Sequence, residues 1–132
     1  MGEGNSFVSR MANALREGKQ VTTPEAEVRT PIDVITLGRA LTELAGHEYR
    51  GIVHLSGSDR LNRHEMMQRI ARRLGLPEEL VIAQDPSGIP GRAPRPRDVA
   101  LDNSKAKEIL KTPMAGLDEG LELVLAAAKE RV

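Results

Sequence analysis

The chain contains no cysteine and no tryptophan, and its 132 residues include only one tyrosine and one phenylalanine. Without cysteine it forms neither disulfides nor thiolate metal sites, and we expect a cytoplasmic protein. The scarcity of aromatic residues predicts an aliphatic core and leaves few rings on which nucleic-acid bases could stack. No apolar run approaches the roughly 20 residues that a membrane-spanning helix requires, and the chain does not open on a signal-peptide-like apolar stretch.

Charge of one sign is also missing, because 19 basic and 19 acidic residues cancel. A neutral chain has no overall field that would attract nucleic acid or anionic lipid. The three histidines, at positions 47, 54 and 64, lack the spacing of metal ligands, and no carboxylate pattern joins them. We therefore expect no metal site, since such sites require three or four converging ligands.

Hydrophobic periodicity predicts about five helices. Candidate caps are Asn5 or Ser6 at the start of the first helix and Asn62, with Glu65 three positions later, at the start of the third. Asp102 or Asn103 is the candidate cap of the fourth. Glycines at 18, 46 and 75 are the expected ends of the first three. The expected helices cover residues 7–15, 37–44, 62–74, 103–110 and 117–128.

Four short segments have strand character, around residues 21–23, 28, 52–55 and 80–83. The strand–helix–strand pattern over residues 52–83 predicts a βαβ unit, in which 52–55 and 80–83 pair in parallel through a right-handed crossover. The predicted fold class is therefore α/β (α+β). We expect a small sheet with this parallel βαβ unit and about five helices, in a single compact domain.

The loop from Gly91 to Asp98 combines three arginines, Arg92, Arg95 and Arg97, with prolines at positions 94 and 96. Guanidinium groups form paired hydrogen bonds with phosphate or carboxylate oxygens. Proline reduces the entropy that is lost when such a loop becomes ordered. The loop therefore predicts a site for an anionic ligand, for example a phosphorylated small molecule, without implying catalysis.

Several segments resemble, in order, the C-terminal part of extended short-chain dehydrogenase/reductases, with the dTDP-4-dehydrorhamnose reductase family as the nearest group. Gly51–Gly57 followed by Arg63-His64-Glu65 is similar to one family motif, and Arg95–Asp98 followed by Leu101-Asp102 and Ser104-Lys105 to another. Arg29–Val34 resembles the arginine-bearing strand before a family helix, although Thr36 stands where the family usually has aspartate. The resemblance covers nearly all of residues 1–132.

The resemblance implies that these enzymes bind NAD(P) through an N-terminal Rossmann half and use a Tyr-x-x-x-Lys pair. The only tyrosine here, Tyr49, has Val53 four positions later, and no nucleotide-binding βαβ unit precedes residue 50. We therefore expect residues 1–132 to be a substrate-binding domain without the Rossmann half. It should hold no cofactor and be inactive alone. The intact enzyme could be a reductase, an epimerase or a dehydratase.

By resemblance, Arg29 and Arg95 match arginines near the diphosphate of a nucleotide-sugar ligand, and Asn5, Ser6 and Phe7 match an N-terminal contact. Arg92 and Arg97 are candidate auxiliary contacts. An equally weighted alternative for Arg29 is a salt bridge to Asp33 or Glu27. The residues Asp102, Ser104 and Lys105 are interpreted as capping and loop-fixing groups.

Two other classes of function stay open. The chain could be a stand-alone binding or oligomerisation module, which forms a homo-oligomer through the helix at 117–128 or through the surface exposed by the missing Rossmann half. The missing Rossmann half itself is another candidate partner. Alternatively, arginines of the basic helix 62–75 could bind nucleic acid, although the zero net charge argues against it. Strongly salt-dependent affinity for DNA would favour the second alternative.

Overall fold

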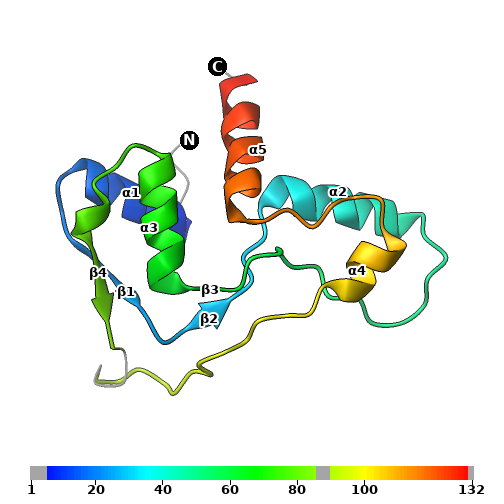
Figure 1. Ribbon diagram of the computed structural model, residues 1–132, viewed down its shortest axis with the longest axis horizontal. Helices are drawn as coiled ribbons and strands as arrows, with labels where there is room; N and C mark the ends of the chain where they lie inside the picture. Colours follow the sequence, from blue (N-terminus) through cyan, green and yellow to red (C-terminus); the bar gives the residue numbers. More distant parts are fainter. Residues whose placement is uncertain (1–5, 86–89, 131–132) are drawn as a thin grey trace. The chain divides into compact units, whose positions relative to one another are not determined.

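The computed structural model describes residues 6–85 and 90–130. It confirms the α/β fold class, with five α-helices, one short 3₁₀ helix and a small parallel sheet in that part of the chain (Figure 1). The elements in order are α1 (Phe7–Arg16), β1 (Val21–Pro24), β2 (Val28–Arg29), α2 (Val34–Ala45), β3 (Leu61–Asn62), α3 (Arg63–Arg73), η1 (Glu78–Leu80), β4 (Val81–Gln84), α4 (Ser104–Ile109) and α5 (Leu117–Glu130).

The chain divides into two compact units, each built from two separate stretches of sequence. The first unit combines the chain up to Arg29 with Leu61–Val99, and therefore contains α1, α3 and all the strands. The second combines Thr30–Arg60 with the chain from Ala100 onward, and contains α2, α4 and α5. This division is finer than the one compact domain that the sequence predicts.

The first unit is organised around the parallel pair of β1 and β4, whose register places Val21 opposite Val81. Helix α3 packs against both strands, and α1 packs against α3 and β1. Val21, Thr23 and Val81 are buried, as are Met67, Ile70 and Ala71 of α3. A second, antiparallel pair joins β2 to β3 and places Arg29 opposite Leu61.

The predicted pairing of residues 52–55 with 80–83 is wrong. The parallel partner of β4 is β1, and residues 52–55 belong to no strand in the described part of the chain. The segment nevertheless keeps a period of two. Val53 and Leu55 pack against the core of the second unit, while Ile52 is 82% exposed. An alternating extended segment without a neighbouring ladder explains why the strand pattern was misleading.

The core of the second unit is small and aliphatic. Ala40 of α2 and Ala106 of α4 are fully buried, and Leu110 and Met114 complete the cluster. Ile32, Leu44, Val53, Leu55 and Ile109 pack around it. Helix α5 joins this unit through contacts with α2.

The helix ends follow the local signals in the sequence. The side chains of Ser6, Asp33 and Asn62 accept hydrogen bonds from the N–H groups of the third residue on, at 3.1, 2.8 and 2.7 Å. Gly18 and Gly75 follow α1 and α3 with φ values of 72° and 67°, a conformation that glycine adopts at little cost.

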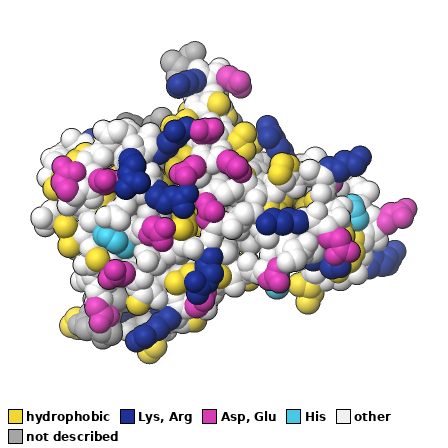
Figure 2. All heavy atoms as spheres, viewed as in Figure 1, with side chains coloured by type: hydrophobic (Ala, Val, Ile, Leu, Met, Phe, Trp, Pro, Cys, Tyr) yellow, Lys and Arg dark blue, Asp and Glu magenta, His cyan; other side chains and the backbone are white. Residues whose placement is uncertain are grey.

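None of the described helices combines the length and the apolar character of a membrane span. Acidic and basic side chains alternate over the face shown in Figure 2, in agreement with the balanced composition.

Candidate anion-binding site

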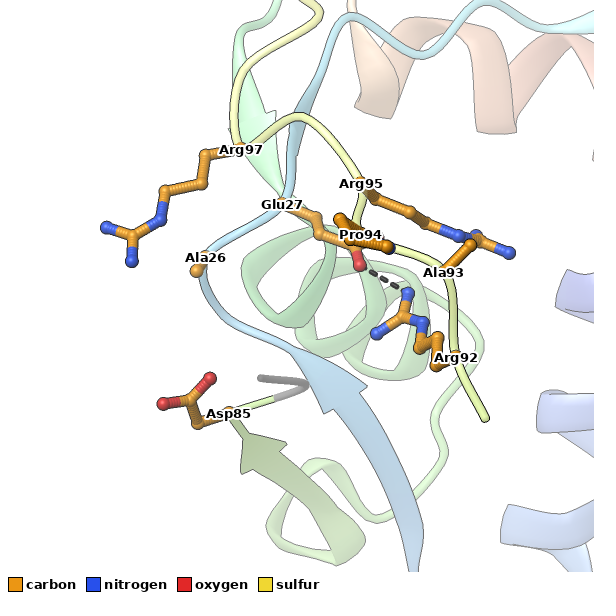
Figure 3. A pocket seen from close by; sticks show the side chains of 8 residues that line it. All are labelled: Ala26, Glu27, Asp85, Arg92, Ala93, Pro94, Arg95 and Arg97. Atoms are coloured by element: carbon orange, nitrogen blue, oxygen red, sulfur yellow. Dashed lines mark hydrogen bonds and ion pairs between the residues drawn. The ribbon is translucent and has the colours of Figure 1, made fainter. Parts of the chain in front are cut away.

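The arginine-rich loop forms one wall of a pocket of about 300 Å³ in the first unit (Figure 3). The opposite wall comes from the β1–β2 connection and from the residue after β4. The lining residues are Ala26, Glu27, Asp85, Arg92, Ala93, Pro94, Arg95 and Arg97. This volume lies at the lower end of the range for small-molecule sites.

The loop is attached at its C-terminal end by backbone hydrogen bonds to β2. The Val28 amide donates to the Arg97 carbonyl oxygen at 2.6 Å, and the Val99 amide donates to the Val28 carbonyl oxygen at 3.3 Å. Val28 and Asp98 form an isolated parallel bridge. This attachment keeps residues 92–95 across the pocket from the β1–β2 connection.

At its other end the loop is attached through a side chain, Glu27. The Glu27 carboxylate is only 4% exposed and forms an ion pair with Arg92. The guanidiniums of Arg63 and Arg29 also lie close to Glu27 Oε2, at 3.5 and 3.6 Å. Three cations thus surround one buried carboxylate, which compensates the cost of burying its charge.

Arg95 and Arg97 differ from Arg92. Both are exposed, and within residues 6–85 and 90–130 neither side chain has a hydrogen-bond or ion-pair partner. In Figure 3 they leave the loop in opposite directions, whereas Arg92 points at Glu27. The three loop guanidiniums therefore do not converge on one point, and two of them are available to an anion from solvent.

Among the residues that the structure describes, the other predicted site residues do not line this pocket. Arg29 contacts Glu27, as the salt-bridge alternative expects, and donates to the Val28 carbonyl oxygen at 2.7 Å. Ser6 is the N-cap of α1. The Phe7 ring lies 4.4 Å from the guanidinium carbon of Arg63, a cation–π distance. Asn5 lies outside the described residues.

Sequence reasoning missed Glu27 and Arg63 as part of this arrangement. The sequence suggests Glu27 only as an alternative partner of Arg29, and Arg63 only as part of a family motif and of a basic helix. The sequence does contain a weak signal for Glu27, because it stands between two predicted strands. An acidic residue that becomes buried there requires a cation nearby. Which of the chain's arginines supply that charge is a matter of tertiary structure.

Near α4, Asp102 and Ser104 form the expected capping contact, whereas the N-cap residue Asn103 forms no side-chain cap hydrogen bond and Lys105 forms an ion pair within the helix. The Ser104 amide donates to Asp102 Oδ1 at 2.8 Å, and hydrogen bonds from the Ser104 hydroxyl and amide lower the pKa of Asp102. Lys105 pairs with Glu108 at 2.8 Å, which raises the pKa of Lys105. Within the described ranges, no three His, Cys, Asp or Glu residues are placed to hold a metal ion.

The family model for the RmlD substrate binding domain matches residues 1–130. The chain belongs to this family. The resemblance seen in the sequence is thereby confirmed. The search of curated proteins found no match to the chain.

Two solved structures are similar to this RmlD-type domain. One is a hypothetical dTDP-4-dehydrorhamnose reductase from Sulfolobus tokodaii, with 33% identity and a TM-score of 0.74 over 87% of this chain and 41% of that one. The other is dTDP-4-dehydrorhamnose reductase from Bacillus anthracis str. Ames in complex with NADP, with 19% identity and a TM-score of 0.83 over 94% and 44%. The second likeness concerns the fold alone. The chain covers less than half of either protein.

Proposed function

We propose that this RmlD-type domain binds the diphosphate of a nucleotide sugar in the arginine-lined pocket, as the substrate-binding part of a dTDP-4-dehydrorhamnose reductase-like or epimerase-like enzyme. The family match carries the proposal, because it covers residues 1–130. The pocket supports it chemically, since Arg92, Arg95 and Arg97 all line it. Guanidinium groups match the geometry of phosphate oxygens and can bind two of them at once.

Arg95 is the main ligand group in this proposal, because its guanidinium is exposed and has no partner within the described ranges. Arg97 and Arg92 are auxiliary. Arg29, Ser6 and Phe7 complete the proposed surroundings, and Asn5 stays a prediction. Two charge-assisted hydrogen bonds contribute about 1.5–3 kcal/mol each, and the cost of immobilising a ligand offsets much of this gain. We therefore expect dissociation constants of about 1 mM at best.

Titration of the chain with dTDP, followed by NMR or calorimetry, tests the proposal. Arg95→Ala should weaken dTDP binding at least about tenfold, the loss of one charge-assisted contact. The matched control is Arg50→Ala, which removes a guanidinium that is also exposed but belongs to the second unit. Melting temperatures of both variants should stay near the wild-type value. Equal dTDP affinity of Arg95→Ala and wild type would refute the site.

The same proposal assigns hydride transfer and NAD(P) binding to a part outside these 132 residues. The chain lacks Tyr-x-x-x-Lys, since Tyr49 is its only tyrosine. We expect no binding of NADPH and no turnover of dTDP- or UDP-sugars by the chain alone. Micromolar NADPH affinity in the same calorimeter would contradict this assignment. The cytoplasmic location stays a prediction.

The alternatives are less well supported. The basic helix includes α3, where Arg72 pairs with Glu78 at 2.8 Å and Arg63 lies 3.5 Å from Glu27. These ion pairs reduce the charge that α3 could offer to nucleic acid. An oligomerisation or partner-binding role of residues 117–128 stays a prediction.

A further inference from the structure

We propose that Glu27 is the positioning residue of the arginine pocket: its buried carboxylate holds Arg92, which lines the pocket, in the arrangement that an anionic ligand meets. This inference rests on the proposed function for its ligand, but its first consequence can be measured without any ligand. Glu27 lies in the β1–β2 connection and lines the pocket itself.

The carboxylate joins three parts of the first unit. Its oxygens contact Arg92 of the loop, Arg63 at the start of α3, and Arg29 of β2. The Glu27 carbonyl oxygen also accepts a hydrogen bond from the Arg63 amide at 3.1 Å. The guanidinium carbon of Arg63 also lies over the Phe7 ring, 4.4 Å from the ring centre. Glu27 therefore connects the loop to α1 through Arg63.

The charge balance of this cluster favours an additional anion. One carboxylate faces three guanidiniums, and all four side chains are at most 27% exposed. Without Glu27 the three cations would repel one another and Arg92 would lose its ion pair. With Glu27 the three guanidiniums are held in place, but a single carboxylate does not neutralise their three positive charges. Binding costs less conformational entropy when the side chains that contact the ligand are already ordered.

Geometry and charge can be separated with Glu27→Asp. Aspartate keeps the negative charge but is shorter by one methylene, so its carboxylate withdraws from Arg92. Trypsin measures the ordering of the loop directly. The bond after Arg92 is cleavable, the bond after Arg95 is protected by Pro96, and cleavage after Arg97 is distinguished by the mass of its fragment. Cleavage after Arg50, in an exposed stretch of the second unit, provides an internal reference.

We expect the rate of cleavage after Arg92, divided by that after Arg50, to rise about tenfold in Glu27→Asp. This is the effect of losing one charge-assisted contact when cleavage follows the population of the open loop. Glu27→Gln, which keeps the length and removes the charge, should show a rise in the same direction. Unchanged cleavage ratios in both variants would overturn the positioning role, whether or not dTDP binds.

Binding then tests the connection to the ligand. Glu27→Asp should weaken dTDP binding at least about threefold in the wild-type background and have no further effect in the Arg92→Ala background, because coupled residues are not additive. Equal losses in both backgrounds would indicate a purely structural role and overturn the proposal. If the wild type binds no dTDP while the cleavage ratio rises, the proposed function fails and the positioning role stands.

Discussion

Replacement of Gly57 by alanine should be among the most damaging small substitutions in this chain. A Cβ atom on Gly57 would lie 1.8 Å from the carbonyl oxygen of Pro31 and 3.2 Å from that of Ala115. Both neighbours are backbone atoms, so no flexible side chain can move aside. The backbone of the segment must shift instead, and this shift is the source of the predicted cost.

The shift would also disturb the buried amide of Asn103. Its Nδ2 donates to the carbonyl oxygens of Ser56 and Gly57 at 2.9 and 3.3 Å. Overpacking costs about 1–3 kcal/mol, and each weakened hydrogen bond adds about 0.5–1.5 kcal/mol. We expect Gly57→Ala to lower the free energy of unfolding by about 3–5 kcal/mol, a large part of the 5–15 kcal/mol typical of a domain.

Thermal unfolding followed by circular dichroism measures the effect. A loss of this size corresponds to a melting temperature lower by roughly 10–20 °C in a chain of this length. Gly38→Ala is the matched control, because Gly38 is exposed within α2 and an added Cβ meets nothing within 4 Å. It should stabilise the protein by about 0.5–1 kcal/mol. A melting temperature of Gly57→Ala equal to that of the wild type would refute the close approach to Pro31.

Two further predictions concern groups at the ends of helices. Asn62→Ala removes the cap that accepts the Glu65 amide at 2.7 Å and should cost about 1 kcal/mol in urea unfolding. An unchanged urea midpoint would contradict that role. Glu43 has a pKa lowered from 4.5, first by the Thr112 hydroxyl and then by the amides of Lys111 and Thr112. A lowered folded pKa gives stability that is complete above pH 4.5 and is lost as pH falls through the folded pKa. As the pH falls from above 4.5 through the folded pKa, the free energy of unfolding of the wild type should approach that of Glu43→Gln. A difference in unfolding free energy that does not change with pH would argue against these hydrogen bonds.

Local signals in the sequence predicted the helices well, because the residues that begin and end a helix act within a few positions of its termini. Asn62 with Glu65 marked the start of α3, and Gly75 marked its end. The ordered motifs also identified the family, and the density of arginine and proline at 91–98 pointed to the loop that lines the pocket. Each of these inferences depends on neighbouring residues or on their order along the chain.

Strand partners and charge partners were decided by the tertiary structure. Residues 52–55 have the alternation of a strand, but β1 takes the place beside β4. The charge on Glu27 is likewise compensated by Arg63 and by Arg92, which lie 36 and 65 positions away. Pairings over such separations depend on how the segments pack, since many arginines could satisfy one carboxylate equally well. Sequence alone therefore predicted the arginines of the loop, whereas the fold brought Glu27 and Arg63 to them.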